Sequence, residues 1–158
     1  MTIGDKNILK EDEHKSHAFR ATGLFLYEFS QLEYTIRDLL RGVSRSAEEQ
    51  LKTLMTPNDF LNVCAMAENA FIQRAPMQEG AFKELFKKCR NLNEERMNIV
   101  QGFYIDRDGN VPPQFTSSGT QKAFDYFTNP DKLIRLAHTA KEISDEFIND
   151  VLVFSNSK

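Results

Sequence analysis

Apolar residues recur every three or four positions along most of the chain, which is the spacing of one face of an α-helix. The clearest stretch predicts a long helix over 13–43. The charged residues 1–12 that precede it lack such a stripe, and we expect them to be frayed. The apolar stripe of the long helix consists of Phe19, Thr22, Phe25, Leu26, Phe29, Leu32, Ile36, Leu40 and Val43.

Two shorter helices are predicted next. The capping box SAEE opens a short helix over 46–55. Thr56 followed by Pro57 predicts the cap and first position of a third helix, with Asp59 near its positive N-terminal end. The segment RAPMQEG, 74–80, ends that third helix.

A fourth helix is predicted over 78–100 and a fifth begins at the segment TNPDKL, where Thr128 or Asn129 caps and Pro130 takes the first position. Between them, 102–120 combines aromatic and β-branched residues with a DG turn and two prolines, which predicts a small hairpin or an ordered loop. The apolar face of the fifth helix comprises Leu133, Ile134, Leu136, Ala137, Ala140, Ile143, Phe147, Ile148 and Val151.

These elements predict an all-α fold. We expect a single domain over 1–158, a bundle of about five helices with a short hairpin or loop insertion between the fourth and fifth helices. A chain of 158 residues with 41% hydrophobic content and 13 Phe is large enough to bury a core.

Charge and cysteine content narrow the class of protein. The net charge of −3 argues against a global basic field for nucleic acid. Cys64 and Cys89 both fall inside helical patterns, which predicts buried thiols in a reducing compartment. The chain contains no run of about 18 apolar residues and its N-terminus has no apolar signal core. We expect a soluble, cytoplasmic protein without a cofactor.

One charged residue falls on the apolar face of the fourth helix. At about 100° per residue, Arg96 projects near the middle of the apolar arc, with Asn93 at the edge. Glu33 lies inside the apolar arc of the first helix in the same way. Burying either charge alone would cost several kcal/mol, so the pattern predicts a buried Glu33–Arg96 pair that Asn93 joins. Alternatively, the aliphatic part of the Arg96 side chain stays in the core while its guanidinium reaches the edge of the bundle or a subunit interface. The apolar arc of the fourth helix consists of Phe82, Leu85, Phe86, Cys89, Leu92, Ile99, Val100 and Phe103.

Two segments resemble a known family. The stretch FSQLEYTIRDLL, 29–40, on the first helix and LNEERMNIVQGFY, 92–104, at the end of the fourth are similar to the HEPN superfamily of all-α domains. The resemblance covers roughly 15–153. It implies a helical domain of about this size that forms homodimers, with the fourth helix bringing two copies of Arg96 around one cleft.

The family signature is an arginine, then four to six residues, then a histidine, near the end of a late helix. Arg96 and Gly102 match this pattern, and Tyr104 stands for the aromatic residue that follows the glycine. Glu33 matches the acidic residue that some members carry on an earlier helix.

The chain departs from the signature at two positions. Met97 stands where a polar residue is usual, with Asn98 next to it, and Gln101 stands where the histidine belongs. Catalytic members resemble metal-independent endoribonucleases, in which the histidine moves a proton at the RNA 2′-hydroxyl while the arginine steadies the phosphate. A glutamine amide does not titrate near pH 7, so it cannot act as the general base.

The resemblance therefore implies a non-catalytic binding or regulatory domain, in a phage-defence or toxin–antitoxin setting, whose partner is RNA or a protein. Two alternatives remain open. The chain is an active endoribonuclease that uses Arg96, with Gln101 beside it and a base such as His138, or it is a generic helical protein-interaction module. The binding residues that the resemblance implies are Arg96, Asn98, Gln101, Glu33 and Asn93.

Other candidate sites have simpler explanations. His14 and His17 have the i, i+3 spacing of metal ligands but lack a clear third ligand, so we expect them on a solvated surface. The segment DRDGN does not keep the spacing of a calcium loop. A basic face on the fourth helix, offset by nearby glutamates, is expected to be solvated; it consists of Lys83, Lys87, Lys88 and Arg90.

Overall fold

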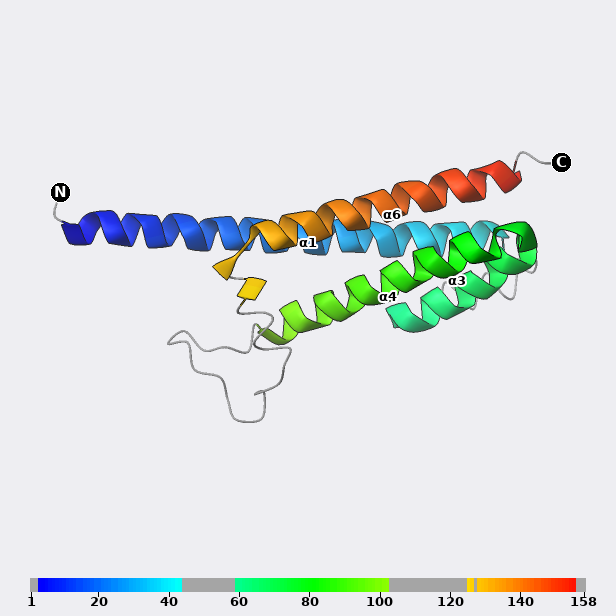
Figure 1. Ribbon diagram of the computed structural model, residues 1–158, viewed down its shortest axis with the longest axis horizontal. Helices are drawn as coiled ribbons and strands as arrows, with labels where there is room; N and C mark the ends of the chain where they lie inside the picture. The colour runs from blue at the N-terminus through cyan, green and yellow to red at the C-terminus, as the bar shows by residue number, and fades with distance from the viewer. Residues whose placement is uncertain (1–2, 44–58, 103–124, 127, 156–158) are drawn as a thin grey trace. The chain divides into compact units, whose positions relative to one another are not determined.

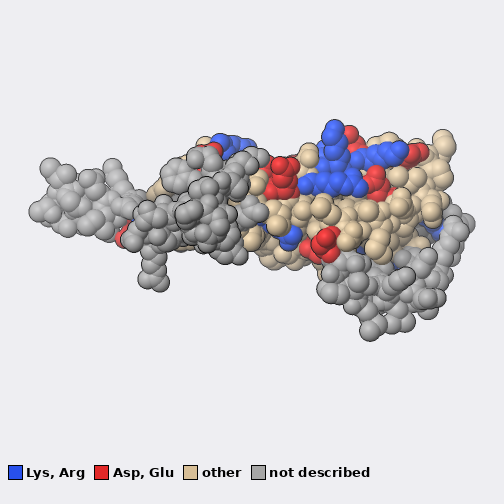
Figure 2. All heavy atoms as spheres, turned by 90° about the horizontal axis from the view of Figure 1, so that it is seen from below, with Lys and Arg blue, Asp and Glu red and all other residues tan. Residues whose placement is uncertain are grey.

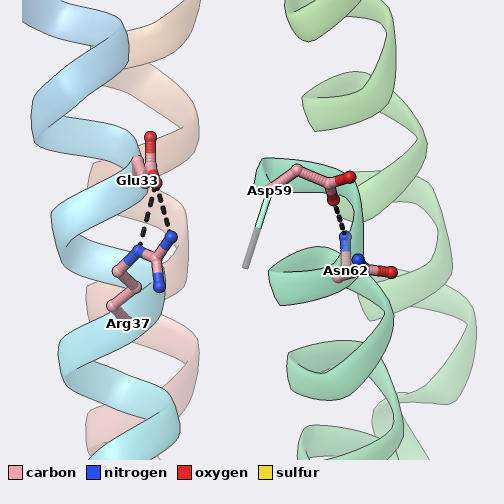
Figure 3. Close-up of polar contacts among 4 residues, drawn as sticks. All are labelled: Glu33, Arg37, Asp59 and Asn62. Carbon is pink, nitrogen blue, oxygen red and sulfur yellow. Dashed lines mark hydrogen bonds and ion pairs between the residues drawn. The ribbon is translucent and has the colours of Figure 1, made fainter. Parts of the chain in front are cut away.

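A computed structural model describes residues 3–43, 59–102, 125–126 and 128–155 (Figure 1). The elements are α1 (Ile3–Val43), α3 (Phe60–Arg74), the short 3₁₀ helix η1 (Pro76–Gln78), α4 (Glu79–Gly102) and α6 (Asp131–Ser155). The all-α prediction is confirmed, since this part of the chain holds four α-helices and no strand. The predicted helix over 46–55 and the predicted insertion beyond Gly102 lie outside the described residues. The prediction that Thr56 caps the third helix is wrong, since the cap of α3 is Asp59, whose side chain accepts from the backbone N–H of Asn62 at 2.8 Å (Figure 3).

Helix α1 is longer than the apolar pattern predicted. It begins at Ile3, whereas the prediction placed its start near residue 13 and left 1–12 frayed. That prediction is wrong for residues 3–12, which are helical. Lys, Glu and Leu in this segment are good helix formers, and an established helix can extend through such residues without an apolar stripe.

The turn between α3 and α4 lies where the sequence predicted it. Helix α3 ends at Arg74, and the backbone N–H of Ala75 donates to the Phe71 carbonyl at 2.9 Å. Pro76 opens η1, and α4 follows directly at Glu79. Helix α4 then continues to Gly102, slightly beyond the predicted end at residue 100.

The start of α6 lies one residue after the predicted one. Pro130 was predicted as the first helical residue, but the helix begins at Asp131, and the N–H of Leu133 donates to the Pro130 carbonyl at 3.0 Å. The Thr128 hydroxyl donates to the Asp125 carbonyl at 2.9 Å, so it belongs to the preceding turn.

The chain forms two compact units. Unit 1 comprises Met1–Tyr27 and Glu94–His138, and unit 2 comprises Glu28–Asn93 and Thr139–Lys158. Helices α1, α4 and α6 each contribute residues to both units.

Aromatic rings fill the core of unit 2. Phe29 of α1 packs on Phe60 of α3, with ring centroids 4.7 Å apart. Helices α3 and α4 run antiparallel in this unit (Figure 1). Phe71 of α3 contacts rings of both α4 and α6, so one side chain joins three helices; these rings are Phe82 at 5.6 Å, Phe86 at 5.7 Å and Phe147 at 6.1 Å.

Small residues of α1 contribute to the core of unit 1. Ala18 and Ala21 are buried, whereas Phe19, predicted in the apolar stripe, is 58% exposed. Positions 18, 22 and 25 lie on the same face of α1 as the buried stripe further along the helix. Phe19 lies outside that face. Thr22 is buried because its hydroxyl donates to the Ala18 carbonyl at 2.8 Å. Other buried side chains of this unit are Phe25, Ile99, Pro130, Leu133 and Ala137.

None of the helices in the described ranges combines the length and apolar character needed to cross a membrane.

Candidate functional site at the end of helix α4

The first part of α4 presents a mixed charged surface. Lys83 contacts Glu79 at 2.5 Å, and Arg90 forms an ion pair with Glu68 of α3. On the face shown in Figure 2, Lys and Arg side chains lie among Asp and Glu side chains. The predicted basic face is therefore partly neutralised by neighbouring carboxylates, which agrees with a solvated helix surface.

Arg96 lies on the core-facing side of α4, as its position in the sequence predicted. The apolar positions one turn before and after it, Leu92 and Ile99, are both buried. The Arg96 side chain is half-buried, its Nε atom is shielded from solvent, and it interacts with other groups of the chain. The fold thus keeps a permanent positive charge next to apolar side chains.

Glu33 has a partner on its own helix. Its Oε1 accepts hydrogen bonds from Nε and Nη2 of Arg37 at 3.1 and 2.8 Å (Figure 3). Both side chains are half-buried and lie one turn apart on α1. An i, i+4 pair on one helix forms without any alignment between helices. Glu33 belongs to unit 2 and Arg96 to unit 1, so the predicted Glu33–Arg96 pair stays a prediction.

The predicted binding residues on α4 do not share one face. Asn93 lies within about 60° of Arg96 around the helix, whereas Asn98 and Gln101 lie about 160° and 140° away. Asn93 is buried, and no described residue makes a hydrogen bond with its Oδ1. The Nδ2 atom of Asn98 is likewise buried, without a hydrogen-bond partner in the described part of the chain.

Two exposed apolar residues accompany Arg96 instead. Met97 and Val100 lie within about 100° and 40° of it around the axis, and each is 42% exposed. Val100 was predicted in the core arc and Met97 was noted only as a departure from the signature, so sequence reasoning missed their exposure. We call Arg96, Met97 and Val100 the α4 end surface; all three belong to unit 1.

A tyrosine is fixed beside this surface. The Tyr126 hydroxyl donates a hydrogen bond to the carboxylate of Glu95, the residue before Arg96. Burial and this hydrogen bond hold the pKa of Tyr126 above its usual value of about 10. Tyr126 therefore remains a neutral hydrogen-bond donor at physiological pH. Its hydrogen bond to Glu95 connects it to the end of α4 within unit 1.

The histidines show no metal-site geometry. His17 is exposed, as predicted, and its Nε2 lies 3.3 Å from Asp131 Oδ1, which joins α1 to α6 within unit 1. His14 and His138 are exposed on their helices. Within the ranges that the structure describes, no group of three His, Cys, Asp or Glu side chains could hold a metal ion.

The two cysteines lie in the core of unit 2, as predicted. Cys64 of α3 and Cys89 of α4 are both buried and free. A hydrogen bond with Cys64, together with burial, raises the pKa of the Cys89 thiol. A buried thiol that remains protonated is a poor nucleophile, so Cys89 is a packing residue.

Comparison with known proteins adds little to this geometry. No protein-family profile and no solved structure matches the chain. A stretch of 102 residues, 65% of this chain, is 30% identical to ABC transporter G family member 28 of Arabidopsis thaliana. That stretch spans 8% of the transporter.

Proposed function

We propose that the chain is a HEPN-like, homodimeric helical domain that binds a partner protein through the α4 end surface and does not cleave RNA. The observation that carries this proposal is the position of Arg96, half-buried on the apolar side of α4 beside two exposed apolar side chains. The family resemblance suggests a regulatory role, of the kind found in phage defence or toxin–antitoxin pairs.

Arg96 combines a charge with exposed apolar neighbours. It interacts with other groups of the chain, and Met97 and Val100 beside it are exposed. Arginine and methionine are enriched at protein–protein interfaces. The guanidinium there makes directional hydrogen bonds, and the apolar neighbours bury surface against the partner.

The charge distribution favours a protein partner over RNA. Binding to a phosphate backbone depends on basic side chains that replace condensed counterions. On α4, Lys83 and Arg90 are each paired with a glutamate, and the whole chain carries a net charge of −3.

The residues of the signature favour binding over catalysis. Gln101 lies in the last turn of α4, where the resemblance would place a histidine, and a neutral amide can neither accept nor deliver the proton of the reaction. The His17 side chain contacts Asp131, so one fewer histidine in unit 1 is available as a general base.

The binding test compares proteins that co-purify with tagged full-length chain from the cells that make it. Arg96→Glu should weaken retention of a specific partner by about tenfold or more, as expected for an interface arginine. Lys87→Glu, a charge reversal on an exposed face of the same helix, should retain it. Val100→Ser, at an exposed position, repeats the test if Arg96→Glu fails to fold. Equal retention by all four proteins contradicts the proposal.

Catalysis is tested separately with mixed single-stranded RNA. The wild-type chain should leave the RNA intact, because no general base replaces the missing histidine. Gln101→His restores the signature residue and should introduce cleavage that Arg96→Ala abolishes. Cleavage by the wild-type chain that depends on Arg96 would establish the alternative, an endoribonuclease with another base.

A further inference from the structure

The two cysteines of the chain lie on neighbouring helices of unit 2. Cys64 of α3 and Cys89 of α4 are each 0% exposed, and both thiols are free. A hydrogen bond joins the two side chains, so their sulfur atoms lie within reach of each other. The core of unit 2 therefore holds a pair of thiols on two different helices, and the packing of unit 2 alone brings them together.

The register of the two helices explains why these thiols meet. Helices α3 and α4 run antiparallel (Figure 1), and the rings of Phe71 and Phe82 lie 5.6 Å apart. In an antiparallel pair, a step of about two turns back along one helix and two turns forward along the other reaches the next pair of facing positions. Along α3 this step leads from Phe71 to Cys64. Along α4 it leads from Phe82 to Cys89, so a separate ring contact places the two cysteines opposite each other.

We propose that Cys64 and Cys89 are a redox-sensitive pair, which forms a disulfide between α3 and α4 when the chain reacts with a small-molecule disulfide such as oxidised glutathione. Facing residues of closely packed helices have Cα atoms about 5 Å apart. A disulfide spans Cα separations of about 4.4–6.8 Å, so the bond fits between these helices without a change of fold.

The reaction is two successive thiol–disulfide exchanges. One cysteine loses its proton, and its thiolate attacks the S–S bond of the small disulfide and expels half of it as a thiolate. The second cysteine, also as a thiolate, attacks the protein sulfur of this mixed disulfide and expels the other half. The two cysteines lose two protons and two electrons in total, and one small disulfide is reduced to two thiols.

Burial decides when the pair reacts. In the closed, reduced fold Cys89 only packs, because the hydrogen bond with Cys64 and burial raise the pKa of its thiol, and a protonated thiol is a poor nucleophile. The first exchange therefore begins when unit 2 opens locally. The resulting adduct is too bulky for a fully buried position, so closing of unit 2 favours the second exchange, which removes the adduct.

This inference goes beyond the proposed function and does not depend on it. The redox-sensitive pair lies in unit 2, whereas the α4 end surface lies in unit 1. Partner retention and RNA integrity are measured in reducing buffer, where the disulfide is absent. The two proposals can therefore fail separately.

The equilibrium between dithiol and disulfide tests the pair. The full chain is brought to equilibrium with a mixture of reduced and oxidised glutathione, in buffer and in denaturing urea, starting from either form. After an acid quench and alkylation, mass spectrometry gives the fraction of each form. Because facing thiols favour the bond more than a disordered chain does, the ratio of disulfide to dithiol should be about tenfold or more higher in buffer than in urea. A ratio that is equal or lower in buffer overturns the inference, as does a glutathione adduct in place of the bond.

Urea denaturation of the two purified forms gives a second measurement. A disulfide that fits the fold should raise the urea midpoint of the oxidised chain above that of the reduced chain, with native circular dichroism in both. An oxidised chain with a lower midpoint would show that the bond strains unit 2, and the inference would be wrong.

A matched control moves one cysteine off the shared face. Lys88 is exposed and lies about 100° from Cys89 around α4. The variant with Cys89→Ala and Lys88→Cys closes nearly the same loop as the wild type, so the denatured chains are comparable, but its folded form keeps the two sulfur atoms apart. Its disulfide should be no more favoured in buffer than in urea. A preference equal to that of the wild type would mean that facing thiols are not its cause and would overturn the inference. If this variant does not fold, the wild-type ratio and midpoints still decide.

Discussion

Asn93 places an amide in the core without using its oxygen. The side chain is 8% exposed, and no described residue donates to its Oδ1. A buried acceptor without a donor costs about 1–3 kcal/mol. Leucine is similar in size to asparagine, so Asn93→Leu should raise the free energy of unfolding by about 1 kcal/mol. The gain is measured as a shift of the urea midpoint with an unchanged slope.

A neighbouring asparagine provides the matched control. Asn91 is exposed on the same helix, so Asn91→Leu should change stability by no more than about 0.5 kcal/mol. If Asn93→Leu destabilises the chain by a kcal/mol or more, the amide is used by the fold and Asn93 is a structural residue.

At the scale of the elements, periodicity predicted the helices but not all of their faces. The buried stripe from Phe25 to Leu40 was predicted correctly, because long apolar residues at a constant phase leave one possible inner face. Near Phe19 the prediction failed: the core there is formed by Ala18 and Ala21, whose small side chains give a weak signal. Val100 was misplaced for the opposite reason, since an apolar residue near a helix end can remain exposed.

Phe71 should be the most sensitive position of unit 2, because its ring contacts Phe82, Phe86 and Phe147. Phe71→Ala should lower the free energy of unfolding by about 3–5 kcal/mol through lost burial and the resulting cavity. Urea denaturation followed by circular dichroism measures the loss. Leu61→Ala, at a 48% exposed position of the same helix, should cost far less. Similar losses at both positions would show that Phe71 does not join the three helices.

At the scale of the whole molecule, the sequence predicted the fold class and the position of Arg96, but not the Glu33–Arg37 pair. Placing Arg96 on the apolar side of α4 required only helical geometry. A partner for Arg96 on another helix depends on distances between helices, which periodicity does not contain. The pair that Glu33 forms was visible in its own segment, where Arg37 follows one turn later.

Both units contain a group that makes folding sensitive to alkaline pH. In unit 2, a hydrogen bond with Cys64 and burial raise the pKa of Cys89, and in unit 1 burial and Glu95 raise the pKa of Tyr126. Each folded group keeps its proton at a pH where the unfolded chain releases it, above about pH 8.5 for the thiol and about pH 10 for the phenol. The folded state then binds more protons than the unfolded state, so stability must fall as pH rises.

The free energy of unfolding should therefore decrease from about pH 8.5 and decrease more steeply above about pH 10. A fully protonated Cys89 accounts for about 1.4 kcal/mol per pH unit, whereas Tyr126 contributes less because solvent screens a half-exposed group. Urea denaturation in a reducing buffer measures the profile. Cys89→Ala should reduce the loss of stability that begins at about pH 8.5, even though this variant is less stable near neutral pH. Tyr126→Phe should reduce the additional loss above about pH 10. If both variants keep the wild-type slope throughout, neither proton is held by the fold, and the contacts of Cys89 and Tyr126 are weaker than the structure shows.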